Sequence, residues 1–124
     1  MTSSHQTIAT RFFDAYNAAD ADALREVAAD DIHWEHHNKF QGKGLEGLLQ
    51  SIKSFLDRAP DRRFTEPSRT AENGDCLFIE HQWKGTPAVT DPRWRWEEGV
   101  PRTSDVLSLL VIRDGKVVEW SDYG

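Results

Sequence analysis

The sequence is poor in cysteine, in long apolar stretches and in positive charge. Its 124 residues include one cysteine, Cys76, which excludes an internal disulfide. Because Cys76 stands at the head of an apolar stretch, we interpret it as a small core residue rather than as a nucleophile. No apolar run is long enough to span a bilayer, and residues 1–10 carry neither the basic nor the apolar segment of a secretory signal. We therefore expect a cytoplasmic protein without a membrane partner.

The deficit of positive charge argues against another class of partner. Fifteen Lys and Arg residues against 21 Asp and Glu residues give a formal net charge of −6. Such a chain repels a phosphate backbone overall, although residues 61–63 and 93–95 are locally basic. The sequence also lacks a phosphate-binding loop, a metal-ligand cluster and a nucleotide fingerprint. We predict a small-molecule substrate, no nucleic-acid partner, no metal and no organic cofactor.

Tryptophan, in contrast, is abundant. The sequence has five tryptophans, and three of them, Trp83, Trp94 and Trp96, fall within fourteen residues. Large aromatic side chains fill cores, but they also line pockets for flat or apolar ligands. The remaining composition is ordinary for a globular protein, and the length suits one hydrophobic core. We expect a single domain that spans residues 1–124.

The first half of the sequence has the periodicity of amphipathic helices. Apolar residues recur at three- and four-residue steps over residues 8–19 and again over residues 45–56. A short helix is predicted between them over residues 24–28, with Asp20 as its N-cap. The Gln-Gly-Lys-Gly stretch at residues 41–44 is predicted to break the chain.

Period-two alternation predicts strands over residues 32–37, 63–72, 76–83, 104–113 and 116–123. Asn73-Gly74 and Asp114-Gly115 have the residues of tight hairpin turns. Pro67 places its strand at a sheet edge or a bulge, because proline has no amide hydrogen. The long segment from Gly85 to Pro101 is predicted to be a loop or a protruding ribbon, which acts either as a lid or as a dimer contact.

Helices followed by a meander of strands indicate the α+β class. We predict a cone-shaped, curved antiparallel sheet with three N-terminal helices on its concave side, enclosing a pocket. Four apolar residues are expected on the outer face of this sheet: Phe78, Leu107, Leu109 and Val111. Because a monomer would expose them to water, we expect a homodimer that pairs through this face.

Two stretches carry a resemblance to a known family. FFDAYNAADADALREVAADDIHWE near the start and RDGKVVEWSDY near the end, with the order of elements, resemble the SnoaL-like branch of the nuclear transport factor two superfamily. The resemblance covers essentially the whole chain. It implies the fold but not the reaction, since this superfamily includes isomerases, dehydratases, cyclases, epoxide hydrolases and non-catalytic binders.

Limonene epoxide hydrolases are similar to this chain at the last strand. They keep a Trp-x-Asp-Tyr there, and its acid matches Asp122. Their Arg-x-Asp pair on a neighbouring strand falls on His81 and Trp83, so the partner that activates water in that family is missing here. Their water-holding tyrosine and asparagine fall on Trp34 and His36.

Ketosteroid isomerases give a second comparison. Their general-base aspartate also falls on His36, whereas their two oxyanion donors fall on Phe12 and Ser108. Polyketide cyclases of the SnoaL type use acid–base side chains, among them a histidine and an aspartate, with no metal or organic cofactor. The residues of this chain suit that last pattern best.

Alternation within the strands predicts which side chains share a face. Trp120 and Asp122 share one face, as do His81 and Trp83, and the resemblance implies that these faces point inward. We predict Asp122, His81 and His36 as catalytic residues, with a pocket wall formed by Trp34, Trp83, Trp120, Tyr16 and Phe12. In this hypothesis Asp122 and one histidine form an acid–base pair around a small apolar molecule.

Structural roles remain open for the same residues. Asp122 could accept a hydrogen bond from an indole N–H, and an inward histidine is often a satisfied core residue. The strand predicted over residues 32–37 carries His33, Glu35 and His37 on the face opposite to Trp34 and His36. Their spacing suits a metal only weakly, and contact with solvent or with a dimer partner is the simpler interpretation.

The leading functional hypothesis is a cofactor-independent cyclase, isomerase or dehydratase that acts on a polyketide-like molecule. Two alternatives remain, an epoxide hydrolase of the limonene epoxide hydrolase type and a non-catalytic module that binds a small ligand.

Overall fold

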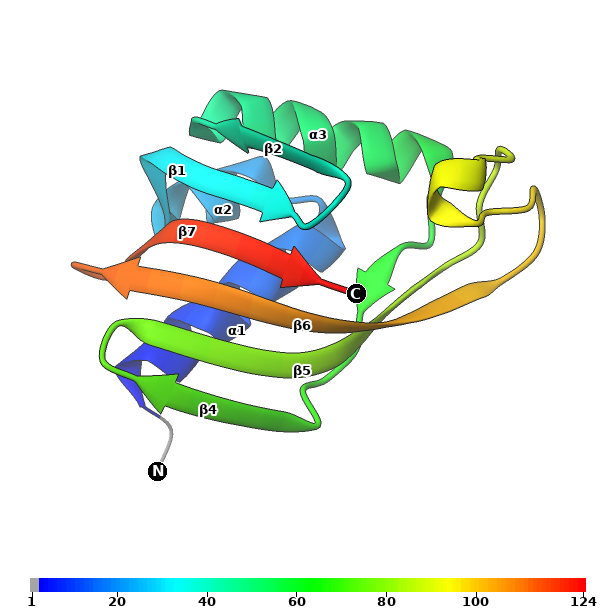
Figure 1. Cartoon of the computed structure of the whole chain (residues 1–124). Helices are drawn as coiled ribbons and strands as arrows, with labels where there is room; N and C mark the ends of the chain where they lie inside the picture. Colours follow the sequence, from blue (N-terminus) through cyan, green and yellow to red (C-terminus); the bar gives the residue numbers. More distant parts are fainter. Residues whose placement is uncertain (1–2) are drawn as a thin grey trace.

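A computed structural model of the chain describes residues 3–124. Within these residues three α-helices lie on one face of a curved sheet (Figure 1): α1 (Ser4–Ala18), α2 (Ala21–Val27) and α3 (Leu45–Arg58). The sheet consists of β1 (Ala28–His36), β2 (Phe40–Lys43), β3 (Arg63–Phe64), β4 (Arg69–Asn73), β5 (Cys76–Gly85), β6 (Arg102–Arg113) and β7 (Lys116–Tyr123). The predicted α+β class is confirmed.

Local side-chain caps explain where the first two helices begin. Ser3 and Gln6 form a reciprocal capping box at the start of α1. Ala19 ends α1 in the left-handed conformation, with φ of 53°. The carboxylate of Asp20 then accepts a hydrogen bond from the Ala23 amide at 3.1 Å, which confirms its predicted role as the N-cap of α2.

The sheet is mixed, which corrects the prediction of a wholly antiparallel sheet. The strand order is β2-β1-β7-β6-β5-β3, with β4 also paired to β5. Neighbouring strands pair antiparallel except for β1 and β7, which run parallel. These two strands come from opposite ends of the chain, and their pairing places the first strand beside the last one (Figure 1).

Two predicted segments fold differently from expectation. The glycine-containing stretch at residues 41–44 does not simply break the chain, because Phe40–Lys43 forms the edge strand β2 against β1. The single strand expected over residues 63–72 is interrupted around Pro67 and becomes β3 and β4. β4 pairs only with β5 and therefore lies at an edge, as Pro67 predicted.

Both hairpin turns and the alternation of β5 agree with the sequence. Gly74 and Gly115 have positive φ values of 61° and 73° in the predicted turns. The four inward residues of β5 are buried, Leu77, Ile79, His81 and Trp83. Cys76 at the start of β5 is half-buried.

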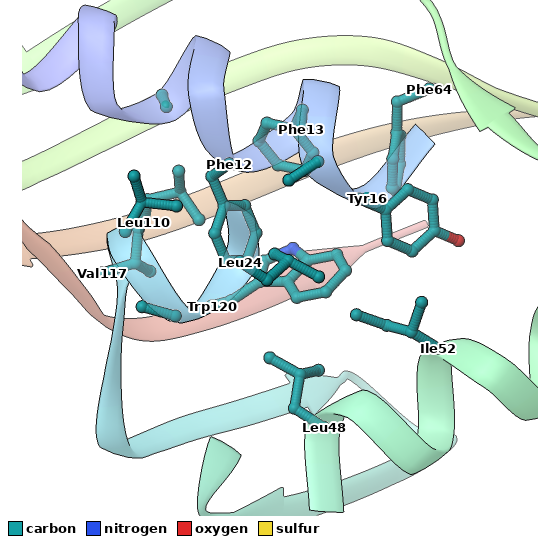
Figure 2. Packing of buried hydrophobic residues seen from close by; sticks show 14 of the residues in the cluster. Phe12, Phe13, Tyr16, Leu24, Leu48, Ile52, Phe64, Leu110, Val117 and Trp120 are labelled. Carbon is teal, nitrogen blue, oxygen red and sulfur yellow. The ribbon is translucent and has the colours of Figure 1, made fainter. Parts of the chain in front are cut away.

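The core fills the space between the helices and the concave face of the sheet. Phe12 from α1, Leu24 from α2 and Leu110 from β6 are at most 1% exposed. Figure 2 shows Phe12 and Tyr16 above the indole of Trp120, with Leu48 and Ile52 of α3 facing it from the other side. Within residues 3–124, no helix has the length and apolarity needed to span a membrane.

Candidate active site

The end of β7 buries a carboxyl group against an indole. Trp120 and Asp122 point to the same face of the strand, and Asp122 is only 6% exposed. The Trp120 Nε1–H donates a hydrogen bond to Asp122 Oδ1 at 2.6 Å, and the Ser108 hydroxyl donates to the same oxygen at 2.5 Å. No side chain or amide within residues 3–124 donates to Oδ2. One carboxyl oxygen is therefore fixed, and the other is available to a ligand.

Burial changes the proton affinity of this group. It raises the pKa of Asp122 to about 7, although the hydrogen bonds from Ser108 and Trp120 oppose the shift by stabilising the carboxylate. Near neutral pH both protonation states are populated, so the group can accept a proton and return it.

His81 is connected to Asp122 through Ser108. The His81 Nε2 lies 2.8 Å from Ser108 Oγ, and because the hydroxyl proton is directed to Asp122, Nε2–H is the donor in this contact. Phe64 stacks on the His81 ring at 4.3 Å, and burial lowers the pKa of the imidazole to about 4. His81 is thus a neutral side chain behind the serine and does not line the cavity described below.

His36 lies beside Asp122 but does not pair with its carboxyl group. The two residues are partners in the register of β1 and β7, and both line the cavity. His36 Nε2 lies 2.9 Å from the Gly124 carbonyl oxygen, which requires a proton on Nε2 and leaves Nδ1 as the acceptor. Burial lowers the pKa of His36. The structure therefore brings His36 and Asp122 to one cavity without a direct hydrogen bond.

The cavity has a volume of about 460 Å³ and lies between α3, the sheet and residues 93–96. All five tryptophans of the sequence line it, Trp34, Trp83, Trp94, Trp96 and Trp120. Asp122 is part of the same lining. The volume falls in the range typical of small-molecule sites, and the wall suits a flat apolar ligand.

Tyr16 contributes a hydroxyl group to the cavity. Its oxygen accepts a hydrogen bond from Trp83 Nε1 at 3.2 Å, which leaves its proton free to donate. Burial raises the pKa of Tyr16, so the hydroxyl keeps this proton at neutral pH. The Arg62 guanidinium lies 4.0 Å from the Tyr16 ring centre and donates to the Tyr16 carbonyl at 2.9 Å, which fixes the residue from behind.

Phe12 lies outside the cavity, unlike the other predicted wall residues. It is fully buried and packs edge-on against Trp120, with ring centres 5.2 Å apart. Its position on α1 is one turn before Tyr16, so it supports the indole from the core side while Tyr16 reaches the cavity.

Residues 86–101 cover one side of the cavity within a single chain. The 3₁₀ turn η1 (Pro92–Trp94) brings Trp94 and Trp96 into the lining, and Trp96 stacks on Trp83 at 5.6 Å. Arg58 of α3 fixes the segment through an ion pair of 3.2 Å with Asp91. The segment is therefore part of the wall, as the lid interpretation requires.

Gly42 and Gly85, which the sequence analysis did not connect with the pocket, make room for two of the indoles. A Cβ at Gly42 would clash with the Trp34 ring, and one at Gly85 would lie 2.7 Å from the Trp83 ring. Trp34 is further fixed by a hydrogen bond from its Nε1 to the Gly44 carbonyl at 3.1 Å. Glycine at these positions allows the aromatic rings to lie flat against the backbone.

The outer face of β1 shows no arrangement of three ligands. His37 Nδ1 lies 3.6 Å from Glu35 Oε2, and its ring stacks on Tyr123 at 3.8 Å. Within residues 3–124, no group of three His, Cys, Asp or Glu side chains is placed to hold a metal ion.

Comparisons with known proteins agree with this architecture. The model of the SnoaL-like domain family matches residues 9–120. Among solved structures, a candidate polyketide cyclase from Xanthomonas campestris is similar with a TM-score of 0.85 and 16% identity, over 99% of this chain and 91% of that chain. A candidate SnoaL-like polyketide cyclase from Jannaschia has a TM-score of 0.82 and 17% identity, over 96% and 83% of the two chains.

An LEH-like epoxide hydrolase from M. tuberculosis is also similar, with a TM-score of 0.77 and 16% identity over 98% of this chain and 83% of that chain. At these identities the solved structures support the fold, whereas the family model identifies the family. A comparison with curated proteins finds no match. With the family model matched from Ala9 to Trp120, the chain belongs to the SnoaL-like domain family.

Proposed function

We propose that the protein is a cofactor-independent acid–base enzyme of the cyclase, isomerase or dehydratase type. The observation that carries the proposal is the Asp122 carboxyl group, which lies in the wall of an aromatic cavity and has a pKa of about 7. A buried carboxyl that titrates near neutral pH is suited to proton transfer at carbon and is costly to retain for structure alone.

The proposed step is enolisation of a carbonyl compound. Asp122 Oδ2 accepts the proton from the carbon next to the carbonyl, and the electrons of the broken C–H bond form the enolate. The Tyr16 hydroxyl donates a hydrogen bond to the enolate oxygen, where negative charge develops. The protonated Asp122 then returns the proton to the same or another carbon, which completes an isomerisation or prepares a ring closure.

The two histidines have different roles in this proposal. His81 is a positioning residue, because it fixes the Ser108 hydroxyl that holds Asp122 Oδ1. His36 lines the cavity, and its Nδ1, which is free of the proton held at Nε2, is a second proton acceptor for a hydroxyl group of the substrate.

The aromatic wall supports a flat, largely apolar substrate. Five tryptophans line a volume of about 460 Å³, which lies within the usual range for small-molecule sites. The similarity to candidate polyketide cyclases favours a polyketide-like compound as the substrate class.

Epoxide hydrolysis is the second candidate, favoured by the similarity to an LEH-like epoxide hydrolase. In this chain Asp122 would act on water, with Ser108 and Trp120 rather than an arginine holding its carboxyl group. A hydrolase would open styrene oxide and place one oxygen from heavy-oxygen water in the 1,2-diol product. If the protein only binds a ligand, the bound ligand would quench the tryptophan fluorescence and no product would form.

The test uses β-tetralone, a flat aromatic ketone, in deuterium oxide. The wild-type protein is expected to accelerate exchange of the α-hydrogens, and Asp122→Asn is expected to reduce the rate by about 10²-fold or more. Arg113→Gln is the control, because Arg113 lies outside the cavity and pairs with Asp75 at 3.4 Å. Equal exchange rates in the wild type and Asp122→Asn would overturn the proposal.

The proposal includes a homodimer that pairs through the outer face of the sheet. Leu107 and Tyr123 on β6 and β7 are 41% and 42% exposed, although both are large and at least partly apolar. A second copy of the chain would cover them.

A further inference from the structure

The mouth of the cavity carries cationic side chains on an otherwise acidic protein. The chain has a net charge of −6, yet four basic residues line the cavity: Lys39, Arg93, Arg95 and Arg102. Glu35 and Asp105 are also lining residues, but the Glu35 carboxylate lies 3.6 Å from His37 on the outer face and the Asp105 carboxylate accepts a hydrogen bond from Gln82 at 3.0 Å. This local reversal of charge is a feature that the proton-transfer chemistry at Asp122 does not require.

Two of the four cations already have partners. Lys39 Nζ donates to the Arg93 carbonyl at 2.8 Å and lies 5.4 Å from the centre of the Trp94 ring. The Arg93 guanidinium lies 3.7 Å from Asp91 Oδ2 and also over Trp94, at 5.8 Å. These two residues shape residues 91–96 and are explained by that role.

Arg102 and Arg95 are different. Neither guanidinium forms an ion pair or a hydrogen bond with any residue in the described range 3–124. The Nε–H of half-buried Arg102 is buried without an acceptor. Arg58 shows the usual solution nearby, since it pairs with Asp91 at 3.2 Å and lies over the Trp96 ring at 5.4 Å. Arg102 lines the cavity with no acceptor for its guanidinium, which is unfavourable unless a ligand supplies one.

The inner end of the cavity, beside Asp122, does not favour the binding of an anion. Its lining there includes Trp120 and Asp122, and a second negative charge beside Asp122 would be repelled whenever that group is ionised. An anionic group is therefore favoured only at the cationic end. Planar guanidinium groups match the two oxygens of a carboxylate.

We propose that the ligand is an aromatic or polyketide-like carboxylate, bound with its carboxylate at Arg102 and Arg95 and its flat apolar body toward Asp122. The position of the apolar body beside Asp122 rests on the proposed function. The position of the ligand's carboxylate rests on the two arginines alone. This arrangement fixes the direction in which the molecule enters, so that the reacting carbon reaches Asp122. The positive mouth also attracts the ligand from solution.

The test compares two ligands of nearly equal size, naphthoate and the uncharged naphthamide. Binding is measured by quenching of the tryptophan fluorescence at low salt and about pH 8, where a carboxylic acid is ionised. The wild-type protein is expected to bind naphthoate about tenfold more tightly than naphthamide, in line with charge-assisted hydrogen bonds. Arg102→Gln is expected to remove most of this preference while leaving naphthamide binding within about twofold.

Two further variants make the result specific. Arg95→Gln, which alters an exposed side chain at the mouth, is expected to reduce the preference for naphthoate as well. Arg113→Gln is the matched control, because this arginine lies at the β6–β7 turn and pairs with Asp75. A preference unchanged in both mouth variants, or naphthamide binding as tight as naphthoate binding in the wild type, would overturn the inference.

The outcome separates this inference from the proposed function. If β-tetralone exchange depends on Asp122 but naphthoate has no advantage, only the carboxylate assignment is wrong. If Arg102→Gln removes the naphthoate preference but exchange does not depend on Asp122, the proton-transfer proposal is wrong and the anion site stands.

Discussion

At the scale of single residues, the properties of Asp122 follow from its two neighbours and its burial. Trp120 and Ser108 both donate to Oδ1, which stabilises the carboxylate, but removal from water has the larger effect and raises the pKa to about 7. The same residue therefore links proton transfer to folding, since a pKa that differs between folded and unfolded chains makes stability depend on pH.

This linkage predicts that the free energy of unfolding depends on pH. The pKa of the Asp122 carboxyl is 3.8 in the unfolded chain and about 7 in the folded chain. Between these pH values mainly the folded chain holds the proton. The free energy of unfolding therefore falls as pH rises through this window. Relative to Asp122→Asn, the wild type is expected to lose about 2–3 kcal/mol between about pH 5 and pH 8 in urea unfolding. The contribution of His81, whose lowered pKa acts in the opposite direction, is common to both proteins and cancels. A difference independent of pH would contradict the raised pKa.

The Ser108 hydroxyl connects Asp122 with His81. Ser108→Ala removes a donor that lowers the pKa of Asp122, so the pKa is expected to rise further. It also leaves His81 Nε2–H without its acceptor, at a cost of about 1–3 kcal/mol in the free energy of unfolding. Carbon NMR of labelled aspartate reports the titration. Ser121→Ala is the control, because Ser121 is a buried serine next to Asp122 on β7 and its hydroxyl donates to Glu119 at 3.4 Å rather than to Asp122. We call the chain of hydrogen bonds from His81 through Ser108 to Asp122 the Ser108 bridge. An Asp122 pKa that is the same in Ser108→Ala and in the wild type would contradict a role of this bridge in setting the pKa.

The sequence predicted Asp122 and Trp120 on one face but not the bridge through Ser108. A two-residue turn at Asp114-Gly115 implies a register in which Ser108 faces residue 121. The structure shifts the register by one residue between Val111 and Ile112, and Ser108 then faces Asp122. Nothing in the local pattern of apolar residues marks this irregularity, so the bridge could be found only from the folded chain.

Among the helices and strands, features that depend on neighbouring residues in the sequence are easier to predict than contacts between distant segments. Caps and turns such as Asp20 and Asn73-Gly74 depend on a few neighbouring residues and were predictable. The parallel pairing of β1 with β7 joins Trp34 to Trp120, which are far apart in sequence, and no periodicity encodes it. The glycines behind the tryptophans were missed for the same reason, because each belongs to a contact that only packing defines.

The packing of Trp83 gives an element-scale prediction. Gly85→Ala would place a Cβ 2.7 Å from this indole, at the end of β5 where the backbone φ itself tolerates alanine. We expect a loss of about 1–3 kcal/mol in urea unfolding and a changed near-ultraviolet circular dichroism signal, because the ring must leave Tyr16 and Trp96.

The double variant Gly85→Ala/Trp83→Phe distinguishes this cause from a general effect on the strand. Phenylalanine lacks the outer ring atoms that the new Cβ would meet, so the added cost of Gly85→Ala should largely disappear in the Trp83→Phe background. If the two substitutions are additive, the indole contact is not the reason for glycine at this position.

At the scale of the whole molecule, the cavity is assembled from both ends of one chain. Tyr16 comes from the first helix and Asp122 from the last strand, while residues 93–96 close one side. All of these residues come from one chain, and a homodimer that pairs through the outer sheet face would lie on the other side of the sheet from the cavity.

Leu107 is 41% exposed on the outer face, so Leu107→Glu removes little core packing but places a charge in the proposed interface. Light scattering is expected to show twice the monomer mass for the wild type and the monomer mass for the variant. Val89→Glu is the control, since Val89 is a similarly exposed apolar residue, at 38%, but lies in residues 86–101 rather than on the outer sheet face. Because Leu107 is not one of the lining residues of the cavity, monomeric Leu107→Glu should still bind naphthoate within about threefold of the wild type. A wild-type protein that is monomeric at all accessible concentrations would refute the dimer, and a monomeric variant that loses naphthoate binding would show that the partner copy completes the site.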